Sequence, residues 1–163
     1  MFRVGSDGDV YADGAFYGQA FLSGAADVAE WVPVSESVEP GDVLELDPDN
    51  PGHYRKSRGP CSDLVAGVVS TEPGFVLGSR LATPDFRLAP ENSALLALIG
   101  IVPVKVTDEG GTIQAGHLLT ASSTRGYAMR WNPDGASHCD LVGKALEPMS
   151  DMQGVILVLL TAH

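Results

Sequence analysis

Three side chains near the N-terminus come closest to a catalytic arrangement. Cleavage of a chain by itself requires a nucleophile beside a strained peptide bond and a neighbouring acid or base that activates it. Ser23 could be the nucleophile, and Asp27 and Glu30 follow it at short spacing. The alternative, which we favour, is that the two carboxylates bind backbone N–H groups or an arginine of a neighbouring copy and serve the structure alone.

Two further pairs that include an acid, Ser62-Asp63 and Cys139-Asp140, are better explained by turns. Adjacent residues on a strand point to opposite faces, so neighbours in sequence need not meet. Each Asp precedes an apolar run, and we interpret it as the cap of the turn before a buried strand. Cys61 and Cys139 are too few for a disulfide framework and lack the CxxC spacing of zinc sites. We therefore expect two ordinary, partly buried thiols, although the sequence leaves open whether they pair.

No metal or cofactor site is predicted. His53, His117, His138 and His163 stand in separate loops or at the C-terminal end, without the HxxxH or HxH spacing of a metal site. The glycine-rich stretches contain neither the GK[ST] of a P-loop nor a dinucleotide fingerprint after a strand. We expect no bound metal, nucleotide or other cofactor.

Aromatic side chains in the variable loops offer a candidate ligand surface, formed by Tyr54, Tyr127 and Trp131. Aromatic rings can stack on sugar faces while nearby Asp and Asn side chains bind the hydroxyls, which suits a cell-surface glycan or another receptor. Aromatic side chains also fill subunit interfaces, and that alternative stays open.

The elements that must position these residues are strands. The chain contains 19 Gly and 11 Pro, and its apolar residues fall in short runs, which is typical of strands joined by tight turns. The longest apolar runs, 94–104 and 155–162, are far shorter than the roughly 20 residues of a membrane helix, so we expect no membrane insertion. Residues 1–8 lack a basic region followed by an apolar one. We therefore expect no signal peptide and synthesis in the cytoplasm.

The net charge decides against two further classes of partner. The formal charge is −11 at pH 7, from 21 acidic and 10 basic residues. Such a surface repels phosphate backbones and anionic membranes. Nucleic acid and anionic lipid are therefore excluded as expected partners.

Two halves of the chain repeat the same pattern. Residues 31–34 (Trp-Val-Pro-Val) are echoed by residues 101–104 (Ile-Val-Pro-Val), and a bend centred on Gly41 or Gly116 follows in each half. A strand that begins with Asp-Leu-Val and contains a glycine comes next in both halves, at 63–69 and 140–146. A proline cannot donate to a strand ladder, so each Val-Pro-Val strand should lie at an edge or carry a bulge.

This repeat predicts an all-β head domain at 27–163, with pseudo-repeats at about 29–77 and 99–161 that end alike in apolar runs, 75–77 and 155–160. Two such strand units can bury their apolar faces against each other as a compact barrel or clip. Residues 1–26 hold short strand-like pieces with too little apolar surface to fold alone, and we interpret them as an N-terminal fibre-shaft segment.

Residues 23–31 resemble the opening of a known class of domain. The stretch Ser-Gly-Ala-Ala-Asp-Val-Ala-Glu-Trp is similar to the Gly-Ala-Asp-Tyr-Ala-Glu-Tyr that begins the C-terminal intramolecular-chaperone, autoproteolytic-type domains of phage tail-fibre and neck-appendage proteins. Asp27, Ala29 and Glu30 are the matching positions, and Val28 replaces an aromatic residue. The resemblance implies a homotrimer at the end of a fibre, and the departures bear on cleavage more than on the fold.

Together these observations predict a structural domain that trimerises and caps the C-terminal end of a phage or phage-like fibre, as part of a virion appendage. The alternatives are a self-cleaving intramolecular-chaperone peptidase and a fibre tip that binds a glycan or receptor, so whether the chain is an enzyme stays open. The start within shaft-like sequence favours a fragment with a fibre shaft upstream. The predicted trimer contacts are Phe2, Val4, Val10, Tyr11, Phe16, Arg55, Lys56 and Arg58.

Overall fold

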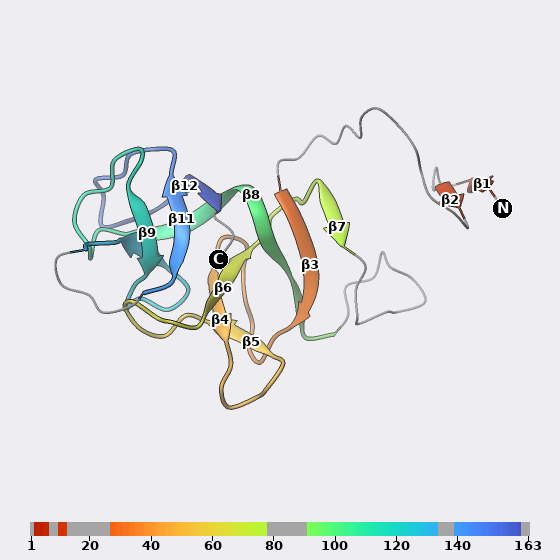
Figure 1. The fold of residues 1–163 in the computed structure, drawn as a ribbon, viewed down its shortest axis with the longest axis horizontal. Coiled ribbons are helices and arrows are strands. Elements are labelled where there is room, and N and C mark those ends of the chain that lie inside the picture. Colours follow the sequence, from red (N-terminus) through yellow and green to blue (C-terminus); the bar gives the residue numbers. More distant parts are fainter. Residues whose placement is uncertain (1, 7–9, 13–26, 78–90, 134–138, 161–163) are drawn as a thin grey trace.

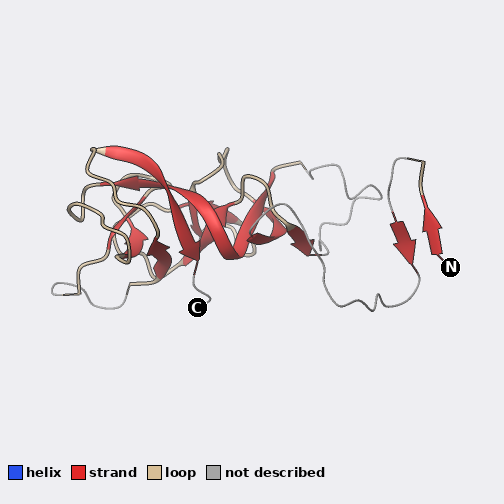
Figure 2. Cartoon of the chain, turned by 90° about the horizontal axis from the view of Figure 1, so that it is seen from above, coloured by secondary structure: helices blue, strands red, loops and turns tan. Residues whose placement is uncertain are grey.

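The described part of the chain consists of strands and loops, which confirms the all-β prediction. The computed structural model describes residues 2–6, 10–12, 27–77, 91–133 and 139–160. Within these ranges there is no helix, and hence none that could span a membrane (Figure 2). The strands, labelled in Figure 1, are β1 (Phe2–Val4), β2 (Val10–Ala12), β3 (Asp27–Pro33), β4 (Val43–Leu46), β5 (Tyr54–Lys56), β6 (Val65–Val69), β7 (Phe75–Leu77), β8 (Ser93–Thr107), β9 (Leu118–Ala121), β10 (Ala128–Arg130), β11 (Leu141–Ala145) and β12 (Gln153–Leu160). β1 and β2 pair antiparallel as a separate sheet.

Five strands close into what we call the C-terminal barrel. The second half of β8 pairs with β12, and β11, β9 and β10 follow in turn until β10 returns to β8. Alternation along β8 builds the barrel core, because Val102, Val104 and Val106 are buried while the residues between them point outward. Ile156 and Val158 of β12 lie opposite Val104 and Val102 and complete this part of the core.

A second ring, the N-terminal ring, uses the first half of the same strand. There β8 pairs with β3 and β6, β6 pairs with β4, and β4 pairs with β5. A bridge between Val34 and Tyr54 brings β5 back to the end of β3 and closes the ring. Figure 1 shows β9, β11 and β12 on one side of β8 and β3 and β7 on the other. The ring has its own core of Val32, Val34, Leu44, Val69, Ala94 and Leu96.

The strand pairings of the ring and the barrel correspond, with one difference from the sequence pattern. Residues 93–100 lie antiparallel between β3 and β6, as β12 lies between the second half of β8 and β11. Gly67 of β6 and Gly143 of β11 occupy matching places. A Cβ on Gly67 would collide with a backbone carbonyl of β8, and a Cβ on Gly143 would collide with a backbone carbonyl of β12. Residues 75–77, which the sequence pattern matched to 155–160, instead pair parallel to β3 outside the ring. This strand has only three residues, whereas 93–100 is long enough to reach both partners.

β8 leaves the core of the N-terminal ring after Leu96, because Ala97 already belongs to the same buried cluster as Val102. The register between β3 and β8 shifts at this point, so that Leu98 has no partner on β3. Leu98, Ile99 and Ile101 are all exposed as a result.

Pro103 lies at a strand edge, as predicted. On the edge of β8 away from β12, β3 pairs with residues 93–100 and β10 pairs with residues 106–107, which leaves a gap between them. The Lys105 N–H points to the gap between them and donates to the Gly41 carbonyl at 3.0 Å. The N–H that Pro103 lacks would face the same gap, so its absence costs no ladder bond. Gly41 has φ +83°, and a Cβ there would stand only 3.3 Å from the Pro103 carbonyl oxygen.

The expectation of two ordinary thiols is wrong, because Cys61 and Cys139 form a disulfide whose Cα atoms are 4.6 Å apart. The two cysteines lie in corresponding loops, before β6 and before β11. Backbone hydrogen bonds hold these loops together, from the Cys61 N–H to the Ala121 carbonyl and from the Asp140 N–H to the Ser62 carbonyl. The cysteines are 78 residues apart, so they meet only because the ring and the barrel pack side by side.

We predict that the Cys61→Ser, Cys139→Ser double variant unfolds with about 4 kcal/mol less free energy than the oxidised wild type, since the disulfide closes a long loop of the unfolded chain. Urea denaturation followed by circular dichroism measures the loss. Wild type treated with a reductant serves as the control and should match the variant. Equal stability of the oxidised and reduced wild type would contradict a closed disulfide.

Candidate assembly surface

Exposed apolar side chains form a continuous strip across four neighbouring strands. Phe75 of β7 is opposite Val28 of β3, which is in turn opposite Ile99 of β8. Ile101 lies two residues further along β8 and is opposite Leu159 of β12. Directly paired residues point to the same face of a sheet, so these side chains share one surface. We call this surface the apolar strip, and it also contains Leu77, Val155, Leu157 and Leu146.

The apolar strip is large for a chain of this size. Apart from the half-buried Val28, its side chains are between 38% (Leu77) and 59% (Val155) exposed. Together they expose on the order of 600 Å² of apolar surface, which matches the largest patch that a typical monomer leaves open, about 300–600 Å². A standard subunit interface covers about 800 Å² on each partner. The strip therefore lies at the upper end of what a monomer leaves open and could supply most of one side of such an interface.

The strip exists because β8 and β12 are apolar on both faces. Ile156, Val158 and Leu160 point into the C-terminal barrel, while Val155, Leu157 and Leu159 alternate with them and point out. Strands that are apolar at every position are typical of sheets covered on both faces. Within the described residues, one face of β12 is covered and the other is not.

A buried carboxylate fixes how the ring and the barrel that carry the strip are joined. Asp42, which is 1% exposed, binds the ammonium groups of Lys105 at 2.7 Å and Lys56 at 3.0 Å. It also accepts a hydrogen bond from the Glu39 N–H at 2.8 Å. Gly126 of the barrel packs against it, and a Cβ there would stand 2.9 Å from Asp42 Oδ1. We call Asp42 and its two lysines the Asp42 clasp.

The lysine of the clasp that lies on β8 is held in its charged form. Burial alone would lower the pKa of Lys105, but its hydrogen bonds to Asp42 and Glu39 and their negative charges raise that pKa above its ordinary value. The hydrogen bond and charge of Lys105 in turn lower the pKa of Glu39. Lys105 also stands 6.0 Å from the ring centre of Tyr127, so this one cation holds groups from both halves.

The basic residues predicted to contact other subunits are bound within the chain. Arg55 is buried and bonds Glu45 at 2.9 Å and Asp47 at 3.1 Å. Lys56 belongs to the clasp, and Arg58 lies 3.7 Å from Glu36. Hydrogen bonds from Asn50 and Ser35 lower the pKa of Asp47 far below its usual range. The structure thus gives these cations intramolecular roles, and their part in a trimer stays a prediction.

The predicted apolar trimer contacts lie mainly outside the residues whose side chains are described. Val4 is exposed. Phe2, Val10 and Tyr11 belong to the β1–β2 sheet, whose side chains at these positions are not described, and Phe16 lies outside the described residues.

Two of the three predicted catalytic residues lie within the described residues, and their catalytic role stays a prediction. Ser23 lies outside the described residues. Asp27 begins β3 and is buried, and its Oδ2 atom has no hydrogen-bond partner. Glu30 lies three residues along the same strand beside Leu77 of β7, and it is half-buried. An odd sequence spacing between Asp27 and Glu30 also places them on opposite faces of the strand.

The predicted aromatic ligand residues lie in different surroundings. Tyr54 packs against the core of the N-terminal ring. Tyr127 faces the clasp lysine, and Trp131 follows β10, where its indole N–H is buried without a partner. Ligand binding by these three residues stays a prediction.

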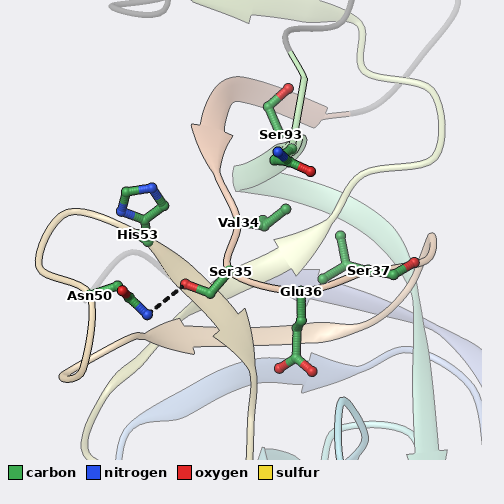
Figure 3. A pocket seen from close by; sticks show the side chains of 9 residues that line it. Val34, Ser35, Glu36, Ser37, Asn50, His53 and Ser93 are labelled. Atoms are coloured by element: carbon green, nitrogen blue, oxygen red, sulfur yellow. Dashed lines mark hydrogen bonds between the residues drawn. The ribbon is translucent and has the colours of Figure 1, made fainter.

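A polar groove opens at one end of the N-terminal ring, with a volume of about 600 Å³ (Figure 3). The segment after β3, the β4–β5 loop and the start of β8 supply its walls. The Asn50 amide ties two of them together, since it donates to Ser35 Oγ and to Asp47 Oδ2. Glu36 in the wall is already bound by Arg125 and Arg58. The lining residues are Val34, Ser35, Glu36, Ser37, Val38, Asn50, His53, Asn92 and Ser93.

Comparison with solved structures finds the same fold in a bacteriophage protein. The premature gene product 12 of bacteriophage phi29 superposes with a TM-score of 0.63 at 19% identity, over 98% of this chain and 24% of that one. A C-terminal fragment of the same phi29 protein superposes with a TM-score of 0.55 at 19% identity, over 83% of this chain and all of the fragment. This chain therefore spans about a quarter of the phi29 protein. No family model and no curated protein matches it.

We predict that Asp42→Asn lowers the free energy of unfolding by about 3–5 kcal/mol, because it leaves the largely buried Lys56 without an anion and Lys105 with the exposed Glu39 alone. Chemical denaturation at neutral pH measures this. The matched control is Asp49→Asn, which removes a carboxylate that also bonds Arg55 but whose side chain is 78% exposed. This control should lose less than about 1 kcal/mol. Losses of equal size in the two variants would show that the clasp does not hold the halves together.

Proposed function

We propose that the chain is a structural domain at the C-terminal end of a phage-type appendage, where three copies assemble and cap the fibre. The observation that carries this proposal is the apolar strip. A chain with net charge −11 gains little from leaving a nearly uncharged apolar surface of this size open. A second copy is the partner that is present wherever the chain is made.

The likeness to phi29 gene product 12 supports placing this domain in a phage-type appendage. The shared fold and the resemblance of residues 23–31 to the start of appendage-protein domains point to the same class of assembly. A closed trimer also covers strand edges such as that of β7, which would otherwise invite open-ended association. The fibre shaft would then enter from the side of Asp27, the first residue of β3.

The whole chain should sediment as a trimer at micromolar concentration. We predict that the Ile99→Ser, Leu157→Ser variant dissociates to monomers under the same conditions, because two central side chains of the strip become polar. Size-exclusion chromatography with light scattering measures the mass. Met152→Ser is the control, since Met152 is 79% exposed but lies outside the strip. A monomeric wild type would refute the proposal, and an unchanged trimer in the double variant would place the interface elsewhere.

Self-cleavage is a second candidate, favoured by one observation. The Asp27 carboxylate is buried, carries an unpartnered oxygen and lies where residues 1–26 join the head. A buried carboxyl without a partner is the kind of group that is retained for chemistry. The phi29 protein has been solved in a form described as pre-mature and as a C-terminal fragment.

If Asp27 takes part in cleavage, the purified wild type should yield two fragments whose masses sum to the whole chain plus one water. The Asp27→Asn variant should stay intact, because the amide cannot exchange a proton as the carboxyl does. Intact-protein mass spectrometry reads both outcomes. An uncut wild type after prolonged incubation would exclude this candidate and leave the structural proposal untouched.

A further inference from the structure

Two charged side chains lie on the apolar strip without a partner. Lys144 is directly opposite Leu159 of the strip. Glu30 is directly opposite Leu77 of the strip on one side and the buried Leu96 on the other, so it lies at the border between the strip and the ring core. Neither forms an ion pair among the described residues. By contrast Arg55, Lys56, Arg58, Lys105 and Arg125 each bind at least one carboxylate.

The two charges cannot meet within one copy. Glu30 lies on β3 and Lys144 on β11, and β8 and β12 lie between them. Three strand spacings of about 4.8 Å separate them across the sheet, and their partners on β8 lie five residues apart along it, so the carboxylate and the ammonium stand about 20 Å apart. The strip therefore carries Glu30 at its β3–β7 end and Lys144 at its β11–β12 end, where the exposed Glu147 accepts a hydrogen bond from the Leu157 N–H at 2.9 Å.

A cyclic trimer needs such an asymmetric surface. In a closed ring of three, each copy presents two different patches, and one patch contacts the other patch of the next copy. We propose that Lys144 of one copy forms an ion pair with Glu30 of the next copy, within the interface made by the apolar strip. This inference rests on the proposed trimer and names the contact that sets its register.

The chemistry of the strip favours this pairing over an apolar contact alone. Copies with a net charge of −11 repel each other, and the strip contains no carboxylate other than Glu30 among its paired residues. When the interface closes, both charges lose water, so each needs an opposite charge. Such desolvated pairs contribute to orientation more than to affinity, and the loss of one partner is costly.

Charge reversal and its double swap test the contact. We expect Glu30→Lys and Lys144→Glu each to raise the concentration for half-dissociation of the trimer at least tenfold, because each places like charges together. The double variant Glu30→Lys, Lys144→Glu should return to within threefold of wild type. Sedimentation velocity over a concentration series measures all four proteins. Asp63→Lys reverses an exposed acid away from the strip and should leave dissociation unchanged.

The outcomes separate this inference from the proposed function. A wild type that is monomeric at every concentration defeats the trimer and the contact together. A trimeric wild type whose single variants dissociate like Asp63→Lys, or whose double variant stays as weak as the single ones, overturns the contact and leaves the trimer intact. Should a reversal variant fail to fold by circular dichroism, Glu30→Gln and Lys144→Gln replace it. Each single substitution to Gln should then weaken the trimer more than the variant that carries both substitutions does.

Discussion

Strand β8 hydrogen-bonds to strands of both the N-terminal ring and the C-terminal barrel, and most of the structure follows from this double use. Its first half packs Ala94 and Leu96 into the ring core, and its second half packs Val102, Val104 and Val106 into the barrel core. Where the strand changes from one core to the other, Ile99 and Ile101 cannot be covered by either. The exposed apolar strip is thus a consequence of joining two closed units through one strand.

A shared strand alone would leave the two units free to pivot, and two contacts at the joint prevent this. The Asp42 clasp draws the ring turn onto Lys105 of β8. The disulfide between Cys61 and Cys139 links the corresponding loops of the two units. Because both contacts are formed within one chain, the strip is a preorganised surface, and a partner that binds it does not bear the cost of ordering it.

Local features of the fold could be predicted from the sequence, whereas the features that join the two halves could not. The edge position of Pro103 and the bend at Gly41 follow from the backbone chemistry of proline and glycine. The disulfide, the Asp42 clasp and the pairing of 93–100 depend on contacts between distant segments, and no short motif encodes them. The apolar strip did leave a signal, since 94–104 and 155–162 are apolar on both faces, which is typical of strands covered on both sides.

The candidate site was predicted in part. Glu30 was singled out from its spacing to Asp27, but its place beside Leu77 on the strip became visible only in the pairing register. Lys144 carries no sequence signal, because a single lysine in a strand is usually a solvated one. The basic loop residues were the obvious choice for a contact between acidic copies. Arg55, however, is buried and forms ion pairs with Glu45 and Asp47 of the same chain.

The central claim is that the apolar strip is the surface between copies, and site-specific photo-crosslinking tests it most directly. A photoreactive phenylalanine at position 101 of the whole chain stands in the middle of the strip and replaces the exposed Ile101, so the larger side chain can extend from the surface. We expect crosslinks between copies that map to β7, β3, β8, β11 or β12. Crosslinks that stay within one chain, or that map to the polar groove or the loops of another copy, would contradict it.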